Sequence, residues 1–190
     1  MSNGYRHRGL TLIELLVAVA VIGVLIAVLV PALGHVRATA KTTQCLSNVR
    51  QIGVMVNAYL VASDGVLPSL QNRESTTQPL PAMDNVLVRP GEATKVFACP
   101  ADDKGIFAAS GTSYFWNFTV NGQRVEQLFS IVGGSAASRI PLISDKEGWH
   151  PEIKDRLVVL YADGHASREL TFLSELGVEA VPPSAPEPLP

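Results

Sequence analysis

Glu14 is the residue whose position says most about the chemistry of this 190-residue chain. It is the only charged residue between Gly9 and Leu33, and it stands near the start of an otherwise apolar run. A carboxylate in hydrocarbon costs several kcal/mol unless it is protonated or paired. We therefore expect Glu14 to meet a positively charged partner, and we expect that pairing to be part of the protein's function.

The two cysteines, Cys45 and Cys99, form a second group that could do chemistry. In a domain that faces an oxidising compartment they would form a disulfide, which restricts the unfolded chain and adds a few kcal/mol of stability. The alternative is that both are small buried hydrophobic residues. No CxxC motif or paired histidine accompanies them, so their spacing does not indicate a zinc site.

The second half of the chain contains a third group of reactive side chains, namely Asp102, Asp103, Asp145, His150, Asp163 and His165. Aspartate oxygens suit calcium, so Asp102, Asp145 and Asp163 are weak calcium candidates, but their spacing matches no known ligand pattern. A metal hydrolase that uses His150, Asp163 and His165 is disfavoured because the chain has no nucleophile elbow, phosphate loop or HExxH motif. We expect no enzyme activity and no cofactor, with calcium as the alternative.

An apolar segment positions Glu14. Residues 15–33 contain no charge, and a helix of that length covers roughly 28 Å, enough to span a bilayer. Arg6, His7 and Arg8 precede it without any acidic residue, which predicts a cytoplasmic amino terminus and an outward-facing remainder.

Two simple interpretations of this segment leave Glu14 unexplained. One is a secretory signal cleaved at the small residues 38–40, whose apolar core would be longer than the usual ~7–15 residues. The other is an uncleaved signal anchor.

A third interpretation rests on residues 8–16, which read RGLTLIELL. This run closely resembles the class III signal of type IV pilins and of the pseudopilins of type II secretion. In that family a prepilin peptidase cuts after the glycine and methylates the new amino terminus, and a glutamate is the fifth mature residue. The resemblance implies cleavage after Gly9, methylation of Leu10, where phenylalanine is usual, and an assembly role for Glu14. Pro31 falls where many members have a helix-kinking proline.

Elementary physics supports the same roles. Gly9 has no Cβ, so a protease can approach its backbone closely. Cleavage leaves a cationic amine four residues before Glu14, and in side-by-side helices the amine of one subunit can neutralise Glu14 of its neighbour. A wrong stagger would leave charges unpaired, so Glu14 would set the register of assembly.

Further residues resemble the H-x-DG class of prepilin-type proteins from planctomycete-like bacteria. They are Cys99-Pro100 with Asp102, the segment 113–117, and Asp163-Gly164-His165. We interpret Asp163-Gly164 as a hairpin turn, because Asp tolerates unusual backbone angles and Gly supplies positive φ.

The predicted fold is α+β, with a long transmembrane spine helix and a small antiparallel sheet head, as in pilins. One helix is expected over residues 10–61, weakened at 31–34, with an apolar face formed by Cys45, Val49, Ile52, Val56 and Tyr59. It should end at Asp64-Gly65. A loop with a short helix at 82–88 follows, and then strands at 95–98, 113–119, 126–132, 140–144, 157–161 and 165–168. A helical turn is expected at 171–176.

These elements give a leader (1–9), a membrane and polymerisation helix (10–33), its amphipathic continuation (34–61), a head (62–181) and a proline-rich tail (182–190). The net charge is −2, and removal of Arg6 and Arg8 with the leader leaves 13 basic and 17 acidic residues, a sum of −4. Clustered Lys and Arg are absent from the sequence, so no nucleic-acid partner is expected.

We expect a structural subunit of a type IV pilus-like filament or of a type II secretion pseudopilus. Its partners would be other pilins or pseudopilins, the prepilin peptidase, the inner-membrane assembly platform and the bacterial inner membrane. The head would be periplasmic before assembly and extracytoplasmic in the filament. The alternative is a membrane-anchored extracytoplasmic domain that binds a ligand or acts as an enzyme through the Asp and His residues.

Overall fold

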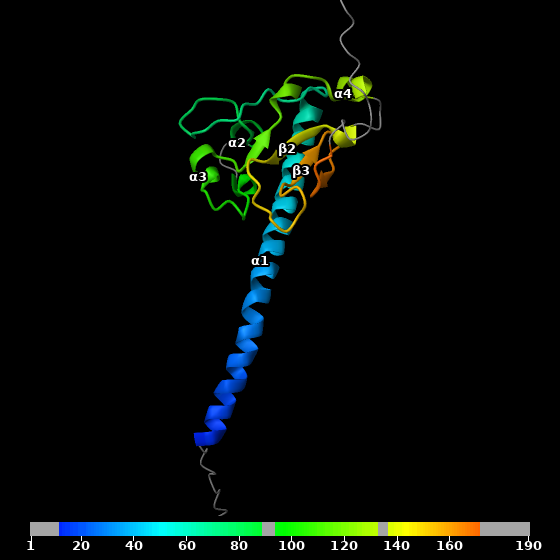
Figure 1. The fold of residues 1–190 in the computed structure, drawn as a ribbon. Helices are drawn as coiled ribbons and strands as arrows, with labels where there is room; N and C mark the ends of the chain where they lie inside the picture. Colours follow the sequence, from blue (N-terminus) through cyan, green and yellow to red (C-terminus); the bar gives the residue numbers. More distant parts are fainter. Residues whose placement is uncertain (1–11, 89–93, 133–136, 172–190) are drawn as a thin grey trace, which may run out of the picture. The chain divides into compact units, whose positions relative to one another are not determined.

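The computed structural model describes residues 12–88, 94–132 and 137–171 (Figure 1). It divides the chain into two compact units, Met1–Thr39 and Ala40–Pro190. The boundary falls inside the first helix, so the carboxyl-terminal part of that helix belongs to the same unit as the head. Each unit is considered by itself below.

The first element is the long helix α1, Leu12–Ala62, which confirms the described part of the predicted spine. It is helical through residues 31–34, so the predicted local melting is not seen there, while the kink at Pro31 stays a prediction. In the described residues, α1 is the one helix long and apolar enough to cross a membrane. It ends as predicted, because Asp64 and Gly65 have φ of 54° and 77°, and the Gly65 amide donates to the Leu60 carbonyl.

The head contains a four-stranded antiparallel sheet, which confirms the α+β fold. Its strands are β1 (Tyr114–Trp116), β2 (Pro141–Asp145), β3 (Val159–Tyr161) and β4 (Ala166–Ser167), in the spatial order β1-β2-β3-β4. Asp163-Gly164 makes the predicted turn between β3 and β4. Gly164 has a φ of 87°, and its amide donates to the Tyr161 carbonyl.

Two predicted strands are wrong, because the structure has helices there. Residues 95–98 lie largely in the 3₁₀ helix η1 (Thr94–Phe97), and residues 126–132 lie in helix α4 (Val125–Val132). The α4 sequence, VEQLFSIV, has apolar residues three and four apart, a helical spacing that its β-branched and aromatic content concealed. The short helix predicted at 82–88 is confirmed as α2 (Met83–Val86).

The remaining short helices were not predicted: α3 (Ile106–Ser110), η2 (Phe118–Val120) and η3 (Ala137–Arg139). Each is five residues or shorter, so it contains too little periodicity to be recognised in the sequence. The predicted turn at 171–176, apart from Thr171, and the predicted tail at 182–190 lie outside the described residues.

The core of the head forms around the carboxyl-terminal part of α1. Cys45, Val49, Ile52 and Val56 are all buried, as the predicted apolar face requires, and Tyr59 at its end is half-buried. Gly53 lets α1 approach β3 closely, because a Cβ at this position would lie 2.9 Å from Leu160 Cδ1. The largest fully buried side chains that complete this core are Trp116, Tyr114 and Phe97.

Candidate functional site: the amino-terminal segment and a buried cluster

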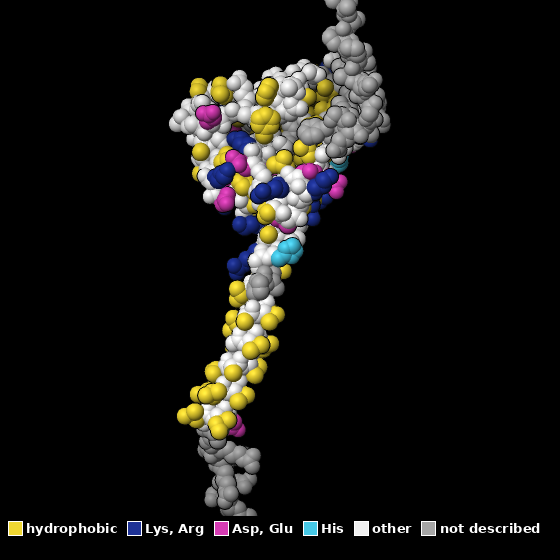
Figure 2. All heavy atoms as spheres, viewed as in Figure 1, with side chains coloured by type: hydrophobic (Ala, Val, Ile, Leu, Met, Phe, Trp, Pro, Cys, Tyr) yellow, Lys and Arg dark blue, Asp and Glu magenta, His cyan; other side chains and the backbone are white. Residues whose placement is uncertain are grey.

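Glu14 lies in the first turn of α1, and the side chains that follow it along the helix are apolar and exposed. Figure 2 shows them along the visible face of this part of the helix. The larger ones are Leu15, Leu16, Val17, Val19, Val21, Ile22, Val24, Leu25, Ile26, Val28, Leu29, Val30 and Leu33. A contiguous apolar surface of this kind needs lipid or other helices to cover it. Gly9 and Leu10, the predicted processing residues, lie outside the described residues.

A second site lies inside the head, where four buried side chains from distant segments meet. Cys45 comes from α1, Cys99 follows η1, Asp145 ends β2, and His150 lies in the loop after β2. Their metal-binding atoms all lie within 4.8 Å of one another. Cys45 Sγ is 3.2 Å from Asp145 Oδ1, and His150 Nε2 is 3.5 Å from Cys99 Sγ and 3.4 Å from Asp145 Oδ2.

Backbone hydrogen bonds position the two ligands that lie on and after β2. The Asp145 amide donates to the Val158 carbonyl, and the Val158 amide donates back to Asp145 Oδ2 at 2.7 Å. The loop that carries His150 is closed by the His150 amide, which donates to the Arg156 carbonyl. These bonds fix the carboxylate and the backbone of the residue that supplies the imidazole.

Other side chains orient the cluster from outside. Thr42 Oγ1 lies 2.8 Å from His150 Nδ1, so Nε2 is the nitrogen that faces the thiols. Glu152 Oε1 lies 3.8 Å from the same Nδ1. The Tyr114 hydroxyl lies 3.5 Å from Cys45 Sγ. Both ring nitrogens of His150 and both cysteine sulfurs therefore have a polar contact within the head.

The cluster perturbs the acidity of its members. A hydrogen bond from Cys45 and another from His150 outweigh the effect of burial and lower the pKa of Cys99 to about 6. The hydrogen bond to Cys99 and burial both raise the pKa of Cys45. Burial lowers the pKa of His150, but its hydrogen bonds to Asp145 and Cys99 raise it more, to about 9. In the absence of a metal, charge would gather on Cys99 and His150.

The comparison with known families bears on the amino-terminal segment. Residues 5–30 match a family model described as the prokaryotic N-terminal methylation motif. This match shows that the chain has a prepilin-type amino-terminal methylation motif, which supports a type IV pilin-like or pseudopilin-like protein. No curated protein and no solved structure matches the chain. The resemblance read from residues 8–16 is thereby confirmed, whereas the narrower resemblance to the H-x-DG class stays a prediction.

The head places the three weak calcium candidates in separate surroundings. Asp102 accepts hydrogen bonds from the amides of Ile106 and Phe107 and from Ser113 Oγ, at 2.8 to 3.0 Å. Asp163 accepts from the amide and ring of His165, in the β3–β4 turn. Asp145 belongs to the buried cluster. In the part of the chain that the structure describes, that cluster is the one group of three or more such donors.

Cys45 and Cys99 lie close together, but not as the predicted disulfide. Both are free thiols in the structure. The sequence did not indicate zinc, because a zinc site is recognised in a sequence when its ligands lie close together along the chain. Here the four side chains come from four segments, and the sequence indicated Asp145 and His150 only as separate residues. The apolar helical face that contains Cys45 was the available signal that one thiol points into the core.

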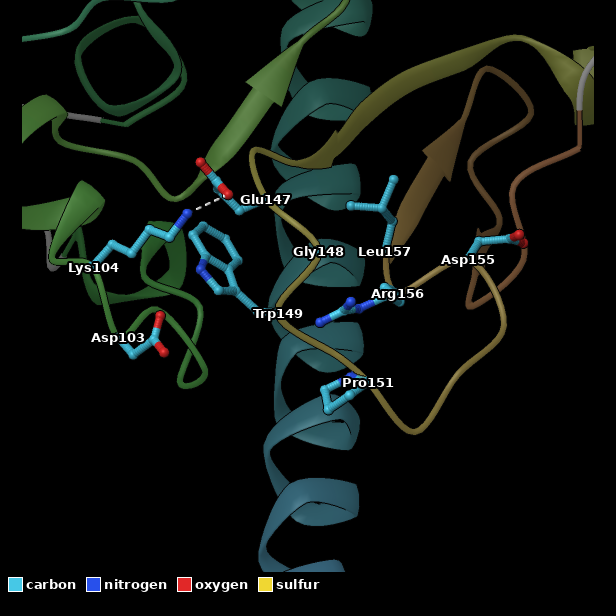
Figure 3. Close-up of a pocket in the computed structure, with 9 residues that line it drawn as sticks. All are labelled: Asp103, Lys104, Glu147, Gly148, Trp149, Pro151, Asp155, Arg156 and Leu157. Atoms are coloured by element: carbon cyan, nitrogen blue, oxygen red, sulfur yellow. Dashed lines mark hydrogen bonds and ion pairs between the residues drawn. The ribbon is translucent and has the colours of Figure 1, made fainter.

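An open groove lies on the outer side of the loop that carries His150 (Figure 3). Trp149 and Pro151, the neighbours of His150, line it, and an ion pair of 2.6 Å joins Lys104 to Glu147 across its side. Its other lining residues are Asp103, Gly148, Asp155, Arg156 and Leu157. His150 itself is buried and does not line the groove. The hydrolase set considered from the sequence is not assembled either, because Asp163 and His165 pair with each other elsewhere.

Proposed function

We propose that this protein is a structural subunit of an extracytoplasmic helical filament, either a type IV pilus-like fibre or a type II secretion pseudopilus. One observation carries the proposal: the methylation motif at residues 5–30 leads directly into an exposed apolar helix with Glu14 in its first turn. A motif that frees an amine beside such a helix suits subunits that pack through their amino-terminal segments.

Before assembly, residues 10–33 would anchor the protein in the inner membrane as a single span, with the head in the periplasm. Prepilin peptidase would cut after Gly9 and methylate Leu10. The assembly platform would then bring the amine of an incoming subunit to Glu14 of its neighbour. This pairing would bring two opposite charges together in an apolar environment, and a misplaced subunit would lose it.

The role of the head in this proposal is mechanical and not enzymatic. As a pseudopilus the filament would push substrates through an outer-membrane secretin, and as a pilus it would extend from the cell. The alternative, a membrane-anchored binding or enzymatic domain, would need an open site such as the groove in Figure 3, because Asp145 and His150 are buried. Charged side chains line the groove together with Gly148, Trp149, Pro151 and Leu157, and no serine, threonine, cysteine or histidine is among its lining residues.

The test compares Glu14→Ala with Glu126→Ala in the native host. Glu126 is a matched control because it also lies in the first turn of a helix, α4, and is exposed. Both variants should be cleaved, with methylated Leu10 shown by intact mass and amino-terminal sequencing. An unpaired charge costs about 3–5 kcal/mol, so Glu14→Ala should reduce the sheared filament fraction at least about tenfold.

Three results would count against the proposal. Normal incorporation of Glu14→Ala into filaments would remove the register argument. A native chain that begins at Met1 would show a simple signal anchor, and one that begins at Lys41 would show a secreted soluble domain.

A further inference from the structure

The buried cluster in the head has the composition of a closed metal site. Two thiols, one imidazole and one carboxylate converge, and the four residues that supply them are all buried. Sulfur and nitrogen ligands in a set of four are typical of structural zinc, which prefers tetrahedral coordination. Four protein ligands would leave no open position for a substrate, so the site would be structural and not catalytic.

Three distances within the cluster are close to the edges of a zinc tetrahedron. Zinc lies about 2.3 Å from sulfur and about 2.0–2.2 Å from nitrogen or oxygen, so the edges of the tetrahedron are about 3.5 Å for sulfur to nitrogen or oxygen and about 3.4 Å for nitrogen to oxygen. Cys99 Sγ to His150 Nε2 is 3.5 Å, and His150 Nε2 to Asp145 Oδ2 is 3.4 Å. Cys45 Sγ lies 3.2 Å from Oδ1, the other oxygen of the Asp145 carboxylate, so one oxygen faces His150 and the other faces Cys45.

The groups around the cluster are those that hold metal ligands in place. A histidine that binds a metal through one ring nitrogen usually donates the other N–H to a neighbouring oxygen. Here His150 Nδ1 lies 2.8 Å from Thr42 Oγ1, which leaves Nε2 for the metal. The carboxylate of Glu152 lies 3.8 Å from Nδ1, and neither of its buried oxygens has a hydrogen-bond partner among the described residues. The Val158 amide holds Asp145 in the same way.

We propose that the head binds one structural Zn²⁺ ion through Cys45 Sγ, Cys99 Sγ, the Asp145 carboxylate and His150 Nε2. The ion would bind two thiolates and a neutral imidazole, and the protons that these groups carry in the free protein would pass to solvent. It would connect α1 to the segment after η1, to β2 and to the loop that follows β2. This inference does not depend on filament assembly, so failure of the Glu14 test would leave it standing.

The first experiment measures metal and thiols in the full-length protein, purified in detergent from native membranes. We expect about one zinc per chain, and two thiols that an alkylating reagent reaches only after denaturation with a chelator. A disulfide between Cys45 and Cys99, seen as a loss of two hydrogens in the intact mass, would overturn the proposal because it uses the same sulfurs. Free thiols with no zinc uptake from added zinc chloride, or copper or iron in place of zinc, would overturn it equally.

Variants then assign the ligands. Cys99→Ser, Asp145→Asn and His150→Gln should each lose zinc. The control variants Asp163→Asn and His165→Asn should retain it, because these two residues form an Asp–His pair at 2.6 Å in the surface turn between β3 and β4. Thr42→Val should weaken zinc binding about 10–100-fold through the loss of its contact to Nδ1. Zinc bound equally by the three ligand variants and the wild type would refute the assignment.

Replacement of zinc by cobalt keeps the proposal testable if the ligand variants fail to fold. The wild-type chain, depleted of zinc and reloaded with Co²⁺, should show the intense visible bands of tetrahedral cobalt and a thiolate-to-cobalt charge-transfer band. A spectrum without thiolate ligation, or one typical of octahedral cobalt, would show that the cluster does not bind the metal as proposed.

Discussion

Ile22 and Ile52 are the same residue type on the same helix, yet Ile22 is 55% exposed and Ile52 is 0% exposed. The two halves of α1 differ in this way throughout. The half within Met1–Thr39 presents apolar side chains outward, whereas the half that begins at Ala40 buries one face in the head. The apolar side chains of the first half need lipid or other helices to cover them, whereas the buried face of the second half is covered by the head of the same chain. One helix thus serves two different kinds of partner.

The polar side chains of the two halves of α1 also differ. Toward the head, buried polar side chains of α1 reach partners in the fold: Thr42 contacts His150, and Asn48 Nδ2 donates to the Ala98 carbonyl at 2.9 Å. In the apolar half, Glu14 is the one acidic residue of the sequence between residues 9 and 33. In the head such polar groups pair within the fold, whereas a charged side chain in a membrane is costly unless it is protonated or paired. The contrast can be tested by moving charge between the two halves.

The largest effect should follow from a charge on the buried face. Ile52→Asp would bury a carboxylate with no designed partner, and we expect it to destabilise the head by about 3–5 kcal/mol. Val54→Asp is the control, because Val54 lies two residues away on the same helix and is 68% exposed. Thermal unfolding of the full-length proteins in detergent, followed by near-UV circular dichroism, would measure both. Equal losses of stability would refute the assigned face.

A charge in the other half should affect the membrane rather than the head. Val24→Lys replaces an exposed apolar side chain within the proposed span, at a cost of about 3 kcal/mol for insertion. We expect less protein in the carbonate-resistant membrane fraction and an unchanged melting temperature of the head. The same lysine at Val54 should leave membrane insertion unchanged. Full insertion of Val24→Lys would show that residues 15–33 do not form the span.

The features predicted correctly from the sequence were those encoded locally. The helix through Cys45 to Val56 follows from apolar spacing, and its end at Asp64-Gly65 and the turn at Asp163-Gly164 follow from residues that tolerate positive φ. The amino-terminal motif is also local, which is why Glu14 could be identified and a family model matches the same residues.

The features that were missed depend on distant contacts or on very short elements. Helix α4 was interpreted as a strand because eight residues rich in β-branched and aromatic side chains suit both structures until packing selects one. The cluster of Cys45, Cys99, Asp145 and His150 joins residues as far apart as 105 positions, from 45 to 150. Local spacing carries no information on such a meeting, so the sequence could not predict which aspartate faces the thiols.

A matched pair of glycines should sharpen the comparison with a smaller effect. A Cβ on Gly53 would lie 2.9 Å from buried Leu160, while a Cβ on Gly23 would meet nothing within 4 Å. Gly53→Ala should therefore cost the head about 1–2 kcal/mol, since overpacking exceeds the gain in helix propensity. Gly23→Ala should leave the stability of the head unchanged. The melting temperatures of the two variants, measured by near-UV circular dichroism as above, test this prediction. A higher melting temperature for Gly53→Ala would show that α1 and β3 leave room for a methyl group at residue 53.

The smallest predicted effect concerns a capping carboxylate in the head. Burial raises the pKa of Asp102, but hydrogen bonds from the Phe107 amide, Ser113 Oγ and the Ile106 amide outweigh it and hold the pKa below its ordinary value. Because the folded pKa is the lower one, the stability that Asp102 contributes is full above the unfolded pKa near ~3.9 and is lost as the pH falls through the folded pKa. Asp102→Asn should cost about 1 kcal/mol at neutral pH.

The pH dependence distinguishes this role from a general effect of removing negative charge. The stability difference between the wild type and Asp102→Asn should stay constant from about pH 5 to 8 and shrink below about pH 4, as the wild-type carboxylate is protonated. Asp103→Asn is the control, because Asp103 is the exposed neighbour. A similar loss in Asp103→Asn would mean that overall charge, and not the cap on α3, is responsible. A stability difference between the wild type and Asp102→Asn that stays constant down to low pH would show that the charge of Asp102 is not responsible. The shape of the side chain would then matter, because aspartate and asparagine both have an oxygen that can accept from the helix amides.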